Sequence, residues 1–275
     1  MQRFLDDNIY DLPHVDEAKF PENDFASSKF DTSHHAELKE VLCLLSTPRS
    51  GSTLFCDLVY RNGGPILHEY FQSNRYMSIM AQRWGISRKY RKLPKFRRRI
   101  QVRVEDYFTH LVSNRVSESG VLGINLHGEH LPNFLKAKPF FQNKPITYLM
   151  IKRKDVLKQA VSFHIALQTK IWSSAFGEPK VSPIYSYEGI KSALLRIVKQ
   201  NASLDLYVEQ HSLNVEEIYY EDLIEDMALV KRCLSGEGTL KLPQVKVQTN
   251  SYNQEFLERF KKKFQYERLG NLADY

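Results

Sequence analysis

The chain has 275 residues, of which 42% are hydrophobic and 26% are charged, a balance typical of a globular protein that buries a sizeable core. Its formal net charge of +7 favours anionic partners. Three cysteines without pairwise spacing exclude a disulfide-stapled module. There is no apolar stretch of membrane-spanning length and no secretory signal pattern at the start, so we expect a single cytoplasmic α/β domain over residues 1–275.

The first quarter of the chain contains one clear strand-to-helix unit. Residues 1–38 are polar with scattered aromatic residues and predict an N-terminal arm. The apolar run at 41–45 then predicts a short buried strand, and residues 54–61 predict a helix. An Asn-Gly-Gly-Pro sequence at 62–65 indicates a turn, after which residues 66–71 suggest a second extended segment.

The rest of the chain alternates between predicted strands and helices. Residues 76–118 are very polar and predict a helical insertion, within which residues 88–103 are rich in lysine and arginine. Strands are expected at 120–126, 145–151 and 215–219, and helices at 155–172, 188–211 and 255–264. Strands that alternate with helices predict a parallel sheet flanked by helices.

The turn at residues 47–53, with the sequence Thr-Pro-Arg-Ser-Gly-Ser-Thr, is the most informative local motif. It joins a predicted strand to a predicted helix, so free backbone N–H groups and the positive end of the helix dipole meet there, which suits an anion. Gly51 permits close approach of the backbone, and Arg49 adds a fixed charge. The candidate anion-binding residues of the turn are Arg49, Ser50, Gly51, Ser52 and Thr53. The alternative interpretation is an ordinary turn in which serine and threonine cap the helix.

This turn differs from the loop that binds nucleoside triphosphates. That loop requires a lysine for the outer phosphates, followed by a hydroxyl residue that reaches magnesium. Here Ser52 stands at the position of the lysine, and Ser46 stands at the position of the first glycine. A magnesium–triphosphate site is therefore disfavoured, and a less charged donor is favoured.

A second anion-binding position is predicted at the end of another strand. Ligands of an open parallel sheet bind outside the carboxyl ends of its strands. Arg153 follows the predicted strand at 145–151, and Ser162 lies about two helical turns further on. A guanidinium group suits a phosphate monoester, so the two positions together would fit a nucleotide with two phosphorylated ends. Taken alone, Arg153 is equally well explained as a surface residue.

Together these motifs resemble the sulfotransferases that use 3′-phosphoadenosine-5′-phosphosulfate (PAPS), most closely the bacterial trehalose 2-sulfotransferase-like family. The resemblance extends over residues 41–225 and rests on three blocks, at 46–54, 68–71 and 152–172. It implies a P-loop-like parallel sheet, PAPS as the donor, no metal, and a carbohydrate or glycolipid acceptor. It also suggests a homodimer.

The resemblance assigns roles to individual residues. The turn from Arg49 to Thr53 would hold the 5′-phosphosulfate, with Arg49 also catalytic, and Arg153 and Ser162 would hold the 3′-phosphate. Glu69 matches the family's general base. Chemistry supports this role, because an acceptor hydroxyl must lose a proton as it attacks sulfur. The alternative for Glu69 is a surface carboxylate on an edge strand.

Several residues depart from the family pattern and leave the acceptor open. The family suggests a basic residue after the strand at 120–126, where this chain has Asn125 and then His127. Lys158 stands where a hydroxyl residue would be expected. His127 and His130 resemble a metal-binding pair, but the sequence offers no clear third ligand, and we expect no metal.

Two other functions remain open from the sequence. One is a P-loop kinase of a small molecule, and the other is a non-catalytic protein that binds a polyanion through residues 88–103. That basic run lacks the interleaved aromatic residues typical of nucleic-acid binding, so no nucleic-acid partner is expected. It is better explained as a solvated helix face, or as a contact with a membrane surface or an anionic glycan.

Overall fold

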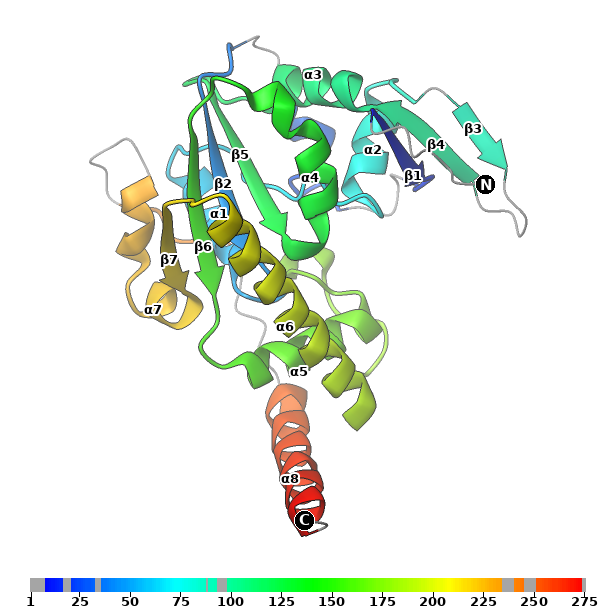
Figure 1. Cartoon of the computed structure of the whole chain (residues 1–275), viewed down its shortest axis with the longest axis vertical. Coiled ribbons are helices and arrows are strands. Elements are labelled where there is room, and N and C mark those ends of the chain that lie inside the picture. Colours follow the sequence, from blue (N-terminus) through cyan, green and yellow to red (C-terminus); the bar gives the residue numbers. More distant parts are fainter. Residues whose placement is uncertain are drawn as a thin grey trace.

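The computed structural model describes residues 8–16, 21–32, 36–87, 89–92, 98–233, 240–244 and 251–273. Its larger sheet has four strands in the order β5-β2-β6-β7, and all three pairings are parallel. The strands are β2 (Glu40–Ser46), β5 (Val121–His127), β6 (Ile146–Lys152) and β7 (Val215–Tyr219). Figure 1 shows helices on both faces of this sheet. The predicted α/β class with a parallel sheet is confirmed.

The helices around this sheet agree with most of the predicted ones. They are α1 (Ser52–Arg61), α4 (Leu131–Ala137), α5 (Val156–Thr169), α6 (Tyr187–Gln210), α7 (Tyr220–Glu225) and α8 (Ser251–Ala273). Asp155 caps α5 as expected, since its side chain accepts a hydrogen bond from the backbone N–H of Lys158 at 2.9 Å. The last helix is longer than the predicted 255–264.

Strand β2 is buried on both faces, which explains its uninterrupted apolar sequence. Val41, Cys43 and Leu45 belong to the core on one side of the sheet. Leu42 and Leu44 belong to the core on the other side, together with apolar side chains of α1. Burial of each such side chain contributes about 1.5–3 kcal/mol. These apolar contacts therefore fix the position of β2 within the sheet, and with it the position of the polar turn that follows.

A second, antiparallel sheet corrects two expectations. Its order is β1-β4-β3, with β1 (Ile9–Pro13), β3 (Lys89–Lys92) and β4 (Arg98–Arg103). The prediction that residues 76–118 are helical throughout is wrong, because β3 and β4 lie between α2 (Tyr76–Arg83) and α3 (Val104–Arg115). Part of the N-terminal arm predicted at 1–38 is likewise a strand.

These errors arose because apolar and polar residues alternate within a segment that is rich in arginine. Ile100 and Val102 of β4 are fully buried, and they face the buried Leu12 and Tyr10 of β1 in the antiparallel register. Arg99, which directly precedes Ile100, points to the other face and forms an ion pair with Asp11 at 2.9 Å. Alternation with a period of two is typical of a strand with one buried face. Only two apolar residues carry this pattern among several arginines, so the sequence interpretation missed the strand.

The segment at 66–71, expected to be extended, forms only one isolated bridge, between His68 and Ile124 of β5. The backbone N–H of Asn125 donates to the carbonyl of His68 at 2.9 Å. Gly123 permits this contact, because a Cβ there would lie 2.7 Å from the carbonyl oxygen of Ile66. The segment therefore runs beside β5 and carries Glu69 to the carboxyl end of that strand.

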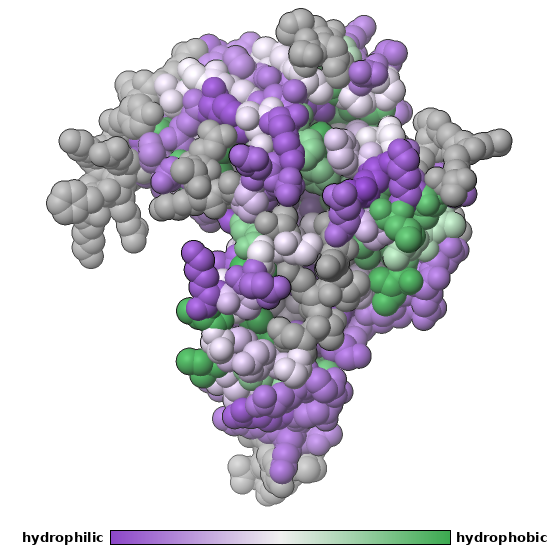
Figure 2. Space-filling model, turned by 180° about the vertical axis from the view of Figure 1, so that it is seen from behind, coloured by the Kyte–Doolittle hydropathy of each residue, from purple (hydrophilic) through white to green (hydrophobic). Residues whose placement is uncertain are grey.

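Hydrophilic residues cover most of the face seen in Figure 2. Among the described residues, no helix combines the length and apolar character needed to cross a membrane. Most side chains of the basic run at 88–103 lie outside the described residues, and those of Arg99 and Arg103 form ion pairs with Asp11 and Glu105.

Candidate functional site

All four strands of the parallel sheet end at one edge, and a cavity of about 940 Å³ opens there. Each strand delivers a different part of its wall. The turn at residues 47–53 follows β2, His127 ends β5, Arg153 follows β6, and Tyr220 follows β7. This is the edge at which open parallel sheets bind ligands.

The turn at 47–53, which we call the phosphate turn, has the backbone of an anion cradle. Gly51 has a φ of +96° and precedes α1, with no side chain capping the first helical N–H groups. Arg49 also has a positive φ, of 65°, a conformation that few residues other than glycine adopt. The Ser50 hydroxyl is buried without a hydrogen-bond partner among the described residues. The uncapped helix start and the orphaned hydroxyl both fit a bound anion.

Two side chains that the sequence interpretation did not select hold this turn in place. Gln159 of α5 is buried and donates to Thr47 Oγ1 at 2.9 Å and to the Pro48 carbonyl at 2.8 Å. Tyr220 closes the other side, since a Cβ at Gly51 would lie 2.3 Å from its Cδ2 atom. Neither residue carries a local signal for this role, because each contact depends on how distant elements pack.

The side chain of Arg49 turns inward and contacts Ser162, another residue predicted to bind the nucleotide. Its Nε donates to Ser162 Oγ at 2.9 Å, and its Nη1 donates to the carbonyl of Trp172. Burial and the nearby Arg153 lower the pKa of Arg49 to about 10. The side chain therefore remains charged near neutral pH and provides a fixed cation in the cavity wall.

Arg153 lies beside the same turn. Its Nη1 donates to the carbonyl of Arg49 at 3.3 Å, while its Nε lies 3.7 Å from Glu221 Oε1. Its guanidinium carbon lies 4.8 Å from the centre of the Tyr220 ring. Two guanidinium groups at one end of a cavity repel each other unless an anion joins them. Arg49, Arg153 and Ser162, selected separately from the sequence, thus come together here.

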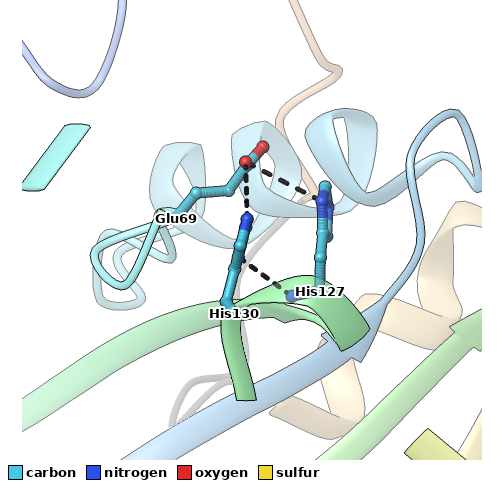
Figure 3. Close-up of side chains that lie close together, drawn as sticks. All are labelled: Glu69, His127 and His130. Carbon is cyan, nitrogen blue, oxygen red and sulfur yellow. Dashed lines mark hydrogen bonds and ion pairs between the residues drawn. The ribbon is translucent and has the colours of Figure 1, made fainter. Parts of the chain in front are cut away.

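The opposite wall contains what we call the carboxylate–histidine cluster, made of Glu69, His127 and His130 (Figure 3). Glu69 Oε2 lies 3.8 Å from His127 Nδ1 and 3.8 Å from His130 Nε2. The two imidazole rings are stacked, with centroids 4.9 Å apart and planes 15° apart. The expectation that the histidine pair has no third partner is therefore corrected, because Glu69 supplies one from a distant part of the sequence.

Glu69 is held from one side and open on the other. Gln72 Nε2 donates to Oε2 at 2.6 Å, whereas Oε1 receives no hydrogen bond from any described residue. Burial is the main cause that raises the pKa of Glu69, against an opposing effect of His127. A carboxylate with a raised pKa and one unoccupied oxygen inside a cavity is suited to accept a proton.

The three residues that depart from the family pattern all lie at the cavity. Asn125 is buried and accepts a hydrogen bond from Ser46 Oγ at 2.6 Å, so it ties β5 to β2. Lys158 lies at the start of α5, lines the cavity and pairs with Asp155 at 3.5 Å. Asn125 and His127 also line the cavity, so all three residues that depart from the family pattern can meet a ligand.

The family of the chain is shown by a comparison with protein-family models. Residues 41–263 match the family described as Stf0 sulphotransferase. Among solved structures, the chain is similar to the "Sulfotransferase Domain from the Curacin Biosynthetic Pathway", at 13% identity and a TM-score of 0.39, over 82% of this chain and 99% of that chain. The search of curated proteins returned no match. The family match includes the phosphate turn, the carboxylate–histidine cluster and Arg153.

Proposed function

Because the chain belongs to the Stf0 sulphotransferase family, we propose that it moves a sulfuryl group from PAPS to a hydroxyl of a carbohydrate or glycolipid acceptor, with Glu69 as general base. One observation carries this proposal. The phosphate turn, with two guanidinium groups beside it, and a carboxylate with one unoccupied oxygen line the same cavity. An anionic donor and a deprotonating group are what sulfuryl transfer to a hydroxyl requires.

The residues on the turn side fit a nucleotide phosphorylated at both ends. Residues 50–53 would hold the 5′-phosphosulfate through backbone N–H groups and hydroxyls, with Arg49 beside them. Arg153 and Ser162 would hold the 3′-phosphate. The orphaned Ser50 hydroxyl and the buried Arg153 Nε, which has no hydrogen-bond partner among the described residues, support this assignment. When bound, PAPS would supply an activated sulfuryl group.

Glu69 Oε1 would take the proton of the acceptor hydroxyl while the hydroxyl oxygen bonds to sulfur and the sulfur–oxygen bond to the nucleotide phosphate breaks. Negative charge then grows on the departing phosphate. Arg49, which contacts Ser162, and the uncapped N–H groups at the start of α1 would stabilise this charge. The kinase alternative is less favoured, because Ser52 occupies the position of the phosphate-binding lysine.

The lining of the cavity supports the proposal that the acceptor is a carbohydrate. Aromatic side chains of Tyr76, Trp172 and Phe176 line the cavity together with polar groups, and aromatic faces combined with hydrogen-bonding groups suit a sugar ring. For a lipid-linked sugar, residues 88–103 are the segment that we propose for contact with a membrane surface. A homodimer is part of the same proposal by family resemblance.

Nucleotide binding tests the donor. Thermal shift is measured with 3′-phosphoadenosine-5′-phosphate (PAP), with ATP and magnesium, and with adenosine 5′-phosphate. We expect a large shift with PAP alone, because only PAP carries phosphates at both positions. A shift that requires ATP and magnesium would instead favour the kinase, and no shift with any nucleotide would favour the polyanion-binding protein.

Replacing the base tests the chemistry. Glu69→Gln should keep the shift with PAP and lower sulfuryl transfer at least about a hundredfold, a typical loss for a general base. Glu255→Gln is the control, since Glu255 lies on α8, pairs with Arg259 and is not among the described residues that line the cavity. Transfer from radiolabelled PAPS to a panel of sugars gives the rates. Unchanged turnover of Glu69→Gln would remove Glu69 from the mechanism.

A further inference from the structure

The carboxylate–histidine cluster contains more than a single base requires. Resting on the proposed role of Glu69, we propose that His130, held as its neutral Nε2–H tautomer, is a positioning residue that orients the Glu69 carboxylate and leaves Oε1 to face the acceptor hydroxyl. The proposal follows from the hydrogen bond on the far side of the His130 ring.

That hydrogen bond fixes the tautomer. The backbone N–H of His127 donates to His130 Nδ1 at 3.2 Å (Figure 3). A nitrogen that accepts a hydrogen bond carries no proton, and a neutral imidazole has one N–H, so the proton lies on Nε2. Burial, reinforced by His127 and His68, keeps the pKa of His130 well below its usual range. The ring is therefore neutral near pH 7.

The proton on Nε2 faces Glu69. The separation from Oε2 is 3.8 Å, longer than a hydrogen bond, but contacts of this kind in free enzymes often shorten when substrate binds. Gln72 already donates to the same oxygen at 2.6 Å. Both donors therefore act on Oε2, and this one-sided arrangement favours the ionised carboxylate while leaving Oε1 for the proton.

A metal ion would be the other use of three such side chains, whose candidate ligand atoms lie within 4.8 Å of one another. The His130 hydrogen bond argues against it. A metal at Nε2 requires the lone pair there and moves the ring proton to Nδ1. That proton would then face the N–H of His127, so two donors would point at each other. The geometry is consistent with a hydrogen-bond donor rather than a ligand.

Other charged groups around Glu69 define what else could change its titration. They are His127 from the end of β5, and Asp24, Arg75 and Glu129 from the surrounding segments. His130 differs from these groups in that the hydrogen bond on the far side of its ring fixes which nitrogen carries the proton that faces Glu69. A variant that removes this proton but keeps the ring's other hydrogen bond should therefore isolate its contribution.

Two substitutions at His130 provide this separation. In His130→Asn, the side-chain oxygen lies near the position of Nδ1 and still accepts from His127, but the donor to Glu69 is lost. In His130→Gln, the amide nitrogen reaches the position of Nε2 and restores the donor. Comparing kcat, the KM for PAPS and the pH dependence of kcat/KM for both variants tests the proposal.

We expect His130→Asn to lower kcat roughly tenfold near neutral pH, with little change in the KM for PAPS. The acidic limb of its kcat/KM profile should shift to a pH about one unit higher, because loss of a hydrogen-bond donor disfavours the ionised form of the Glu69 carboxylate. His130→Gln should recover most of both effects. An equal loss at every pH, or no loss in His130→Asn, would overturn the proposal.

Two further measurements on the wild-type protein do not depend on variant folding. NMR of ¹⁵N-labelled histidine should show His130 with a proton on Nε2 alone at pH 7, and an Nδ1–H or doubly protonated ring would contradict us. Activity should survive extensive treatment with EDTA, and loss reversed by zinc would favour the metal site. If the wild type shifts with PAP but sulfates no acceptor, the proposed function fails, while the NMR result still decides the His130 assignment.

Discussion

The phosphate turn and the carboxylate–histidine cluster line one cavity but are assembled in different ways. The turn consists of consecutive residues that link β2 to the first turn of α1, so its groups are close in the sequence, and Gln159 and Tyr220 hold it from outside. The cluster combines Glu69, from an irregular segment, with two histidines at the end of β5. The difference indicates that donor binding depends on local backbone geometry, whereas deprotonation depends on how two distant segments are docked.

The largest effect is expected where the turn has the least space. Gly51→Ala introduces a Cβ 2.3 Å from Tyr220 in a backbone with φ of +96°, and strain plus overpacking should cost roughly 2–4 kcal/mol. PAP binding should be lost as well. Gly63→Ala is the control, because its φ is +83° but no atom of the described residues beyond its chain neighbours lies within 4 Å of an added Cβ, and it should cost only about 1 kcal/mol. Denaturant unfolding measures both, and equal losses would contradict the role of Tyr220.

A smaller effect, on the affinity for PAP, is expected when Arg49 of the phosphate turn is replaced by lysine. Arg49→Lys keeps a cation but loses the planar fork that contacts Ser162 and Trp172. The affinity for PAP should fall about 10- to 100-fold, the range for one charge-assisted hydrogen bond. Calorimetric titration gives the dissociation constant. Arg259→Lys, at an arginine that pairs with Glu255 on α8, should leave the affinity unchanged, and equal weakening in both variants would argue against a specific role.

The pH dependence should separate the cluster from the turn. Burial raises the pKa of Glu69, and the base acts only when ionised, so transfer should decline on acidification at a pH above the usual range of a glutamic acid. The rate should fall about tenfold per pH unit below that point. PAP binding, measured in parallel, should not follow this limb. A decline in the transfer rate that begins only within or below the usual pKa range of glutamic acid would contradict the effect of burial.

The same shift makes a prediction for stability. A carboxyl whose folded pKa is raised stabilises the fold fully below its unfolded pKa, and this contribution is lost as the pH rises through the folded value. At neutral pH the ionised Glu69 is therefore a cost, and Glu69→Gln should raise the thermal midpoint. Near pH 4 the difference from wild type should shrink. A lower midpoint at neutral pH would show that the contacts of the ionised form outweigh its burial.

The smallest effect is expected at Lys158, on the turn side of the cavity. Its side chain is 54% exposed and pairs with Asp155, so solvent and salt screen its charge. Lys158→Ala should raise the KM for PAPS no more than about threefold, and the difference should disappear at high salt. A large effect that persists in salt would instead place Lys158 in direct contact with the donor.

The sequence by itself determined the phosphate turn and the parallel sheet. An apolar run, a hydroxyl-rich turn and a helix follow one another without interruption at residues 41–61, and the identity of each residue limits its local backbone conformation. Arg153 was found for the same reason, because strands of a parallel sheet end at one edge. Such features depend on residues that are adjacent in the chain or on a rule of topology.

Only the tertiary structure decided how Glu69 meets the histidines and how Arg49 meets Ser162. Gly123 lets the segment before Glu69 approach β5, and nothing in the sequence near Glu69 indicates that contact. The pairing of β1 with β4 joins residues as far apart as Leu12 and Ile100, so the strand pattern of that basic region becomes evident only with its partner. Contacts between distant segments depend on packing of the whole domain, which local preferences do not specify.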